Sequence, residues 1–432
     1  MKFLKISGHN RTIINNFIAL GILQGTNFIL PLVTIPYLVR VLGPDKFGLV
    51  AFAQAFHAYF ILLTDYGFNL SATRDVSIHR NHLGKLSEIF STVLICKLLL
   101  CLLSLVIMII IVENVGEFSQ DKPLMYLSFS LVIGQVILPV WFFQGMERMK
   151  FLTYLSITGK ALSVILVFLL TTSRSDYVIV PLLLSSANIL AGIIGIVIVK
   201  TQFRVTFAFP RVSQIKDQFR EGWHTFVSSF SIGIYVSVNL FILAFFASDE
   251  SVGHYSIAEK IVIAMWQVPG VFSQAIYPFV CSMTTSGFEK IMNLFKRLYI
   301  PFCFLILVAC TILYFFPGPI IQLVAGKPYP EAVSLLRILS FVPFIIALNV
   351  PAYQILMAYN FKSSHTLVFT TATVVNIILN LILASKFSSY GTAFSVVITQ
   401  LLTTIGLYFI LEFRHRDYAL LSYLYKELKR VF

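Results

Sequence analysis

Six charged side chains lie inside long apolar stretches of this 432-residue sequence. A charge near the centre of a membrane helix costs on the order of 2.5–3.5 kcal/mol, and such residues usually face a bundle interior or a wet cavity. Four are basic and two are acidic, so a cavity that they share would attract an anion. Structural pairing or extension to the interface is the alternative for each, above all for the arginine. The six are Lys97, Lys160, Lys260, Arg337, Asp65 and Glu259.

Glu259 and Lys260 are adjacent in the segment YSIAEKIVIAMWQVPG. Neighbouring side chains on a helix point about 100° apart. The two charges therefore do not simply neutralise each other at one spot. We predict that Lys260 faces a cavity, while Glu259 either holds it through a neighbouring helix or carries a proton.

Long apolar runs recur along almost the whole chain, and only 12% of its residues are charged. Each run is long enough to cross a bilayer core of about 30 Å as a helix. We therefore predict an all-α polytopic membrane protein, because the strands of a β-barrel would alternate in segments of about ten residues. The twelve predicted spans are approximately 13–40, 46–72, 88–112, 123–145, 151–172, 176–199, 223–246, 251–284, 291–316, 331–359, 363–385 and 390–412.

Basic residues are unevenly divided between the two sides of these spans. With a cytoplasmic N-terminus, the inner segments carry 22 of the 32 lysines and arginines and the outer segments carry 6. Cytoplasmic loops characteristically hold such an excess. The distribution predicts that both termini are cytoplasmic, and it accounts for the net charge of +13 without nucleic acid.

Six spans precede the longest polar connection and six follow it, so both halves would enter the membrane in the same sense. FGLVAFAQAF from Phe47 and VGHYSIAEKI from Val252 also match weakly at an offset of 205 residues. Together these features predict two parallel six-helix lobes around a central cationic cavity, as in transporters built from repeats. The predicted domains are an N-terminal lobe at 1–205, a cytoplasmic amphipathic linker at 206–222, a C-terminal lobe at 223–412 and a cytoplasmic amphipathic tail at 413–432.

Val212, Ile215 and Phe219 recur at helical spacing in the linker, beside Lys216 and Arg220. This pattern is typical of a helix that lies at a membrane interface. A plain solvated loop is the alternative.

Polar stripes follow one face of the first two predicted helices of each half. Hydrogen bonding between helices would explain a single stripe, but four stripes fit a shared hydrophilic cavity better. The stripes are Asn16, Gln24 and Asn27; Gln54, His57, Asp65 and Asn69; Ser228, Ser231, Tyr235 and Asn239; and Lys260, Gln267 and Gln274.

Motifs of common enzyme classes are missing from the sequence. It has no GxxxxGK[ST], HExxH or GxSxG segment, so nothing predicts P-loop nucleotide binding, zinc hydrolysis or a nucleophile elbow. The five cysteines lie in apolar runs without a CxxC pair, and we interpret them as small hydrophobic residues. All outer loops are short, which favours transport over catalysis. We predict no cofactor beyond a proton or sodium gradient.

Four segments resemble the bacterial polysaccharide repeat-unit flippases, of O-antigen and capsule type, within the multidrug/oligosaccharidyl-lipid/polysaccharide exporter superfamily. The resemblance implies twelve helices in two lobes and alternating access in the bacterial inner membrane. It implies a cargo of oligosaccharide on undecaprenyl pyrophosphate, moved from the cytoplasmic to the periplasmic leaflet, and as further partners membrane lipids and other polysaccharide assembly proteins. The segments are QGTNFILPLVTIPYLVRVLGPDKFG, DYGFNLSATRDVS, WFFQGMERMK and YSIAEKIVIAMWQVPG.

A pyrophosphate would be held by charge-assisted hydrogen bonds from lysine or arginine. Asp65 and Glu259 are the predicted ion-coupling residues, because a carboxylate that alternates between environments can couple an ion gradient to transport. Anchoring at the membrane faces is the alternative for Arg40, Arg74 and Asp75, which lie in the matching motifs. The predicted substrate-binding residues are Lys260, Arg40, Lys97, Lys160, Arg74, Arg337, Gln54 and Gln267.

The sequence thus predicts an ion-coupled flippase for lipid-linked oligosaccharides. A multidrug antiporter of the same superfamily is one alternative, although a cavity for cationic drugs should be acidic. A membrane-bound polysaccharide polymerase or ligase is the other, and the short outer loops disfavour it. The sugar unit, the coupling ion and the oligomeric state stay open.

Overall fold

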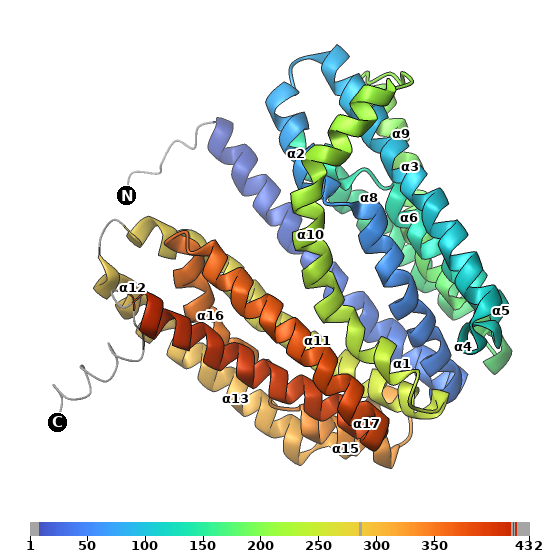
Figure 1. Cartoon of the computed structure of the whole chain (residues 1–432), viewed down its shortest axis with the longest axis vertical. Helices are drawn as coiled ribbons and strands as arrows, with labels where there is room; N and C mark the ends of the chain where they lie inside the picture. Colours follow the sequence, from blue (N-terminus) through green and yellow to red (C-terminus); the bar gives the residue numbers. More distant parts are fainter. Residues whose placement is uncertain (1–7, 285–286, 416–417, 419, 421–432) are drawn as a thin grey trace. The chain divides into compact units, whose positions relative to one another are not determined.

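The computed structural model describes residues 8–284, 287–415, 418 and 420, and Figure 1 traces its helices. Side chains are described from Val33 onward, apart from 224–225, 227–237 and a few single positions. The predicted tail at 413–432 and the side chains of the stripe at Asn16, Gln24 and Asn27 lie largely or wholly outside the described part. Within that part, regular secondary structure is helical throughout.

The chain divides into two compact units, Met1–Ser237 and Val238–Phe432. The helices of the first unit follow one another through short turns. They are α1 (Gly8–Asp65), α2 (Phe68–His79), α3 (Leu83–Asn114), α4 (Gly116–Ser119), α5 (Lys122–Ser128), α6 (Ser130–Ile137), α7 (Val140–Gly145), α8 (Met149–Leu170), the 3-10 helix η1 (Arg174–Ile179) and α9 (Val180–Gln202).

A long helix, α10 (Val212–Leu243), crosses the boundary between the units. The second unit then continues to Arg414. Its helices are α11 (Asp249–Met283), α12 (Phe288–Leu294), the π-helix η3 (Phe295–Tyr299), α13 (Ile300–Phe315), α14 (Pro317–Ala325), α15 (Pro330–Leu339), α16 (Val342–Ala358) and α17 (Lys362–Arg414).

Eight helical stretches in the described part are long and apolar enough to cross a membrane. The first, Val33–His79, and the last, Ser363–Arg414, are each about twice as long as one crossing needs. Both regions contain a break in helical geometry, at Gly43 (φ 78°) and at Ser388 (φ 52°). These breaks fall between the predicted spans 13–40 and 46–72 and between 363–385 and 390–412.

Glycine and proline set several helix ends. Gly43 has a positive φ that L side chains rarely adopt. Proline stands in the first turn of α5, α9, α13 and α15, where its missing N–H would have no helical acceptor. Between α6 and α7 the chain leaves helical geometry at Leu138 and Pro139. The spans are therefore interrupted helices whose ends are fixed by local sequence.

An aromatic core holds the first unit together. Phe68, Trp141, Phe142 and Phe143 are almost completely buried between α2, α3 and α7. Apolar residues also cover much of the outside, since successive turns of α3 expose Leu98, Leu102, Val106 and Ile110 among others. Large exposed apolar surfaces are unusual for soluble proteins. They suit a bundle whose outer surface contacts lipid.

We predict that Gly159→Ala will destabilise the first unit by about 1–3 kcal/mol, because it overpacks a helix contact. A Cβ atom at Gly159 would stand 2.5 Å from the backbone oxygen of Ala187 on α9, so α8 and α9 would have to separate. Gly270→Ala on α11 is the control, since a Cβ there meets open space. Unfolding in detergent should show loss of stability for the first variant and none for the second. Equal stabilities would contradict the close packing.

Candidate functional site

A buried ion pair lies within the first unit. The Nζ atom of Lys97 on α3 is 3.8 Å from Oδ1 of Asp65, and the lysine side chain is only 2% exposed. Asn69 donates a hydrogen bond of 2.6 Å to the same Oδ1 atom. The lysine also approaches the backbone oxygen of Gln135 at 3.5 Å. Both charges were predicted as functional residues, and the structure joins them in one cluster.

A kink between α1 and α2 lies at this cluster. Tyr66 (φ 45°) and Gly67 (φ 73°) both have left-handed backbone geometry directly after Asp65. α2 begins directly after this kink, and its first turn places the amide of Asn69 beside the carboxylate. A lysine so well buried would be costly alone, and breaking such a pair leaves an uncompensated charge. Lys97 and Asp65 therefore depend on each other.

The other predicted residues of the first unit have varied environments. Arg40 and Arg74 are exposed, whereas Gln54 and Lys160 are half-buried. His57, from the same predicted stripe as Gln54, is completely buried and its Nδ1 lies 2.7 Å from the backbone oxygen of Ala53. Exposure at Arg40 and Arg74 is compatible with either anchoring or cargo contact.

Asp75 joins the polar surface at the end of α2. Its carboxylate lies beside the side chain of Gln218 of α10 and close to the charge of Arg74. Nearby, Arg80 pairs with Glu147 at 2.9 Å. The motif residues Arg74 and Asp75 thus belong to a charged end of the first unit.

A second carboxylate–lysine pair lies on α11 in the other unit. Glu259 accepts a hydrogen bond from the buried hydroxyl of Tyr255, one helical turn earlier, and the charge of Lys260 acts on it. Glu259, Lys260 and Gln267 are all half-buried. Gln267 lies two turns beyond the lysine on the same helix face. Each unit therefore has an acid and a lysine close together, from two predicted spans in the first unit and from one in the second.

Arg337 lies apart from that pair, near the end of α15. Its side chain is exposed, and its guanidinium carbon is 6.0 Å from the centre of the Tyr314 ring. That separation is at the limit of a cation–π contact. In the seventh predicted helix, the side chains of Ser228, Ser231 and Tyr235 lie outside the described part of the structure. Asn239, from the same predicted stripe, accepts a hydrogen bond of 3.2 Å from the amide of Asn380.

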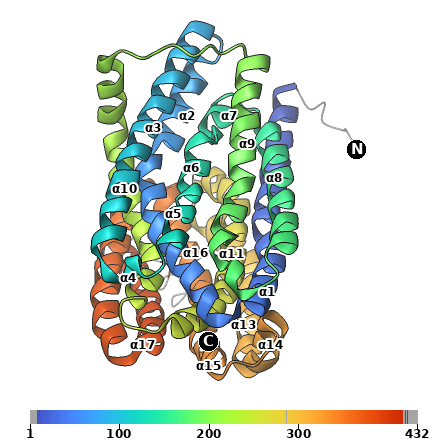
Figure 2. The ribbon, with the colours of Figure 1, turned by 90° about the vertical axis from the view of Figure 1, so that its right-hand side faces the viewer.

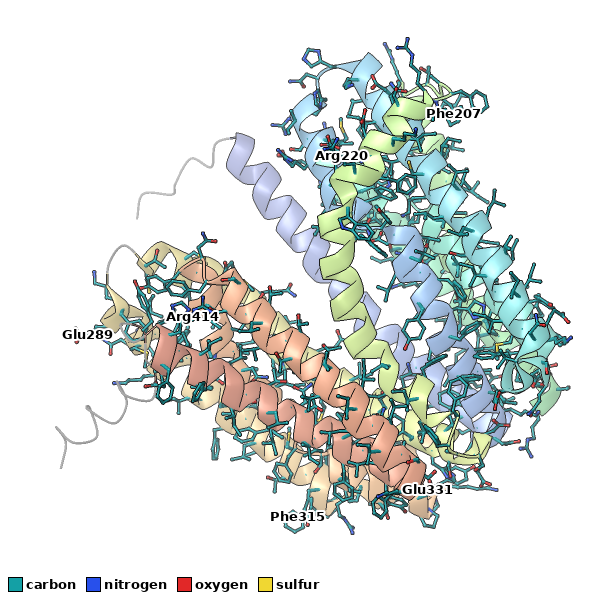
Figure 3. All side chains as sticks on the ribbon, in the orientation of Figure 1. Phe207, Arg220, Glu289, Phe315, Glu331 and Arg414 are labelled. Carbon is teal, nitrogen blue, oxygen red and sulfur yellow. The ribbon has the colours of Figure 1, made fainter. Side chains whose placement is uncertain are left out.

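The structure adds a polar cluster that sequence reasoning missed, centred on Glu331 (Figure 3). His254 of α11 contacts one carboxylate oxygen at 2.8 Å, and Ser251 donates to the same oxygen at 3.2 Å. Ser389, directly after the break in α17, donates to the other oxygen. One carboxylate thus ties together the starts of α11 and α15 and the second half of α17. The sequence does not predict this contact, because its members look like ordinary polar residues at the ends of predicted spans.

A similar tie occurs in the first unit. Asp121, at the start of α5, accepts a hydrogen bond of 2.7 Å from the hydroxyl of Tyr177 on η1. Arg174 of η1 donates to the backbone oxygen of Leu42 at 3.0 Å and pairs with Asp45 beside the break in α1. In each half of the chain, an acid at or just before the start of the fourth predicted span binds a hydroxyl at the start of the sixth, with Asp121 and Tyr177 in the first half and Glu331 and Ser389 in the second. Separate hairpins are thereby held together at one end of each unit.

We predict that Glu331→Gln will loosen the end of the second unit, because hydrogen bonds to a charged group contribute about 1.5–3 kcal/mol. Hydrogen exchange should accelerate at the starts of α11 and α15 and after Ser388. Glu250→Gln is the control, since Glu250 is exposed in the first turn of α11. Unchanged exchange in the Glu331 variant would show that the tie does not hold these helices.

These clusters can bind charge but offer no metal centre. In the described residues, no group of three His, Cys, Asp or Glu side chains could hold a metal ion. In each of the two lysine–carboxylate pairs, the lysine can instead bind an anion and the carboxylate can instead bind a proton. Such groups within membrane helices commonly mark ion and substrate pathways.

Comparison with known proteins adds a family match. A family model described as "Polysaccharide biosynthesis protein" matches residues 13–284. Two curated relatives carry the name "Putative O-antigen transporter". The protein from Escherichia coli K12 is 31% identical, with 90% of this chain and 94% of the relative covered. That from Shigella dysenteriae is 25% identical, with 90% and 98% covered.

Solved structures show the same fold at low sequence identity. An inward-facing multidrug transporter of the MATE family, in the MOP superfamily, gives a TM-score of 0.71 at 15% identity and covers 94% of this chain and 99% of its own. The lipid II flippase MurJ, in an inward closed conformation, gives 0.67 at 16%, with 94% and 89% covered. The predicted all-α polytopic membrane fold is thus confirmed.

Proposed function

Because the chain belongs to the polysaccharide biosynthesis protein family, we propose that it is a flippase for lipid-linked oligosaccharides. It moves repeat units on undecaprenyl pyrophosphate from the cytoplasmic to the periplasmic leaflet of the bacterial inner membrane. The products serve O-antigen or capsule synthesis. The relatives named for O-antigen transport and the fold shared with a lipid II flippase support this proposal.

The observation that carries the mechanism is the buried pair of Lys97 and Asp65. A diphosphate that reaches the lysine competes with the carboxylate for its charge. The released carboxylate would be costly to keep ionised in a dry environment, so it takes up a proton. Cargo binding and proton binding are thereby linked. The pair of Lys260 and Glu259 offers the same exchange in the second unit.

The proposed transporter has twelve spans in two parallel lobes, at 1–205 and 223–412. Dividing the first and last membrane stretches at Gly43 and Ser388 gives ten spans, and α10 and α11 add two more. The similar ties at Asp121 and Glu331 support a repeated lobe. Both termini are cytoplasmic in this arrangement, and the lobes expose the central site alternately to each side.

The proposal is tested with purified protein in proteoliposomes. A lipid-linked oligosaccharide placed in one leaflet should become accessible to an added glycosidase only when the protein and a proton gradient are present. An uncoupler should stop the movement while binding of the lipid persists. Movement that is unaffected by the uncoupler would contradict proton coupling, and no movement under any gradient would contradict flipping.

A multidrug antiporter is the second candidate, favoured by the TM-score of 0.71 to a multidrug transporter. The four lysines and arginines against two acids inside the predicted spans argue for an anionic cargo instead. Gradient-driven efflux of a cationic dye from the same proteoliposomes would support the antiporter. We expect none.

A further inference from the structure

The segment between α9 and α10 is pinned to the start of α3. It runs as an extended connection from one helix to the other (Figure 2). The backbone N–H of Thr206 donates to the hydroxyl of Ser87 at 3.1 Å, and that of Ala208 donates to Ser91 at 3.0 Å. Val205 is buried. The connection therefore has a defined path and is not a plain solvated loop.

A cavity of about 530 Å³ opens between this segment and the starts of α3 and α10. Arg204 and Arg211 stand among its lining residues, together with Ser87, Glu88 and Gln214. Glu88 is the one acid in that lining, and Lys85 pairs with it at 2.7 Å. Its charge is thereby compensated, and the two exposed guanidinium groups give the cavity a positive character.

Exposed aromatic rings stand beside these arginines. Phe207, labelled in Figure 3, is 49% exposed and Phe209 is 87% exposed, and their ring centres lie 5.2 Å apart. The predicted interfacial residues Ile215 and Phe219 instead pack against the core of the first unit. Val212, the third residue of that predicted face, is exposed. The exposed apolar side chains Phe207, Phe209 and Val212 therefore lie in the extended segment and at the very start of α10.

This surface lies where the lipid-facing part of α9 ends. Ile193, Ile194 and Val197 are exposed apolar residues of that helix, and the exposed Lys200 follows one turn later. Phe207 and Phe209 come only a few residues further along the chain. Basic side chains beside exposed aromatic rings suit the boundary between acyl chains and headgroups.

We propose that this surface binds an anionic phospholipid of the leaflet that it faces. Arg204 and Arg211 hold the phosphate in the cavity, while Phe207 and Phe209 insert between acyl chains. The bound lipid fixes the connection between the two halves of the chain against the membrane. The proposal needs only the location of the chain in a membrane, so it stands apart from the identity of the cargo.

The test is titration of delipidated protein in detergent with phosphatidylglycerol, read by native mass spectrometry. Each basic residue near an anionic surface contributes about fivefold to binding. The double variant Arg204→Asn/Arg211→Gln should therefore raise the apparent Kd about 25-fold. Asparagine is chosen because Arg204 has a φ of 54°, a conformation that asparagine tolerates. Lys327→Gln/Lys386→Gln, at exposed lysines of the second unit, is the control and should match wild type.

A second variant tests the aromatic half of the surface. Phe207→Ser/Phe209→Ser should weaken phosphatidylglycerol binding about tenfold or more, because burial of a phenylalanine is lost. Equal affinities for all variants would overturn the proposal. So would phosphatidylethanolamine binding as tightly as phosphatidylglycerol, or displacement of the lipid by inorganic pyrophosphate, which would assign the site to free diphosphate.

Discussion

Replacing Lys97 by methionine should cost about 3–5 kcal/mol of stability, the usual effect of removing one partner of a buried ion pair. In this variant, Asn69 is the only hydrogen-bond donor among the described residues that the largely buried carboxylate of Asp65 keeps. Denaturant unfolding in detergent measures the loss. Lys85→Met is the matched control, because its pair with Glu88 is exposed and such pairs contribute about 0–1 kcal/mol.

The double variant Lys97→Met/Asp65→Leu separates folding from transport. It removes both charges, and replacing a buried ion pair by apolar groups is often neutral or stabilising. We expect the double variant to recover most of the stability that Lys97→Met loses. Transport should be lost in both variants, because the groups that exchange cargo and proton are gone. A stable double variant with normal transport would show that the pair has only a structural role.

Replacing Lys260 by alanine should lower transport about 10- to 150-fold at limiting cargo. A charge-assisted hydrogen bond contributes about 1.5–3 kcal/mol, and this lysine is predicted to face the cargo from α11. Lys260→Arg should retain part of the activity, since it keeps the charge. Flipping in proteoliposomes measures both.

Lys386→Ala is the control for this experiment, because Lys386 is an exposed lysine of the same unit. It should transport like wild type. Equal rates for Lys260→Ala and Lys386→Ala would remove Lys260 from the proposed site. Glu259→Gln tests the neighbouring carboxylate. If transport by that variant stays coupled to the proton gradient, proton binding is assigned to Asp65 alone.

The apolar pattern of the sequence predicts the all-helical membrane fold, because each crossing needs its own run of lipid-compatible residues. Even the breaks at Gly43 and Ser388 fall between predicted spans. The charged residues of the spans can be identified from the sequence as well, since few charges occur in apolar runs. The contact between Lys97 and Asp65 cannot be predicted in this way, because it depends on how α1 and α3 pack against each other in the fold.

Other features depend on which surface a helix meets. Helical spacing correctly groups Ile215 and Phe219 on one face, but an apolar face suits a lipid interface and a protein core equally well. The structure shows them against the core. His254 and Glu331 look like ordinary polar residues at helix ends until the fold brings α11, α15 and α17 together. Long-range packing of this kind leaves no local pattern in one sequence.

Cargo movement is tested most directly in the cell that makes the cargo. The gene is deleted, and the polyprenyl-linked lipids of the inner membrane are analysed by mass spectrometry. We predict that a single complete repeat unit accumulates on the cytoplasmic side, and that wild type clears it while Lys260→Ala does not. No accumulation, or accumulation already in the outer leaflet, would contradict flipping and favour a drug exporter or a polymerase.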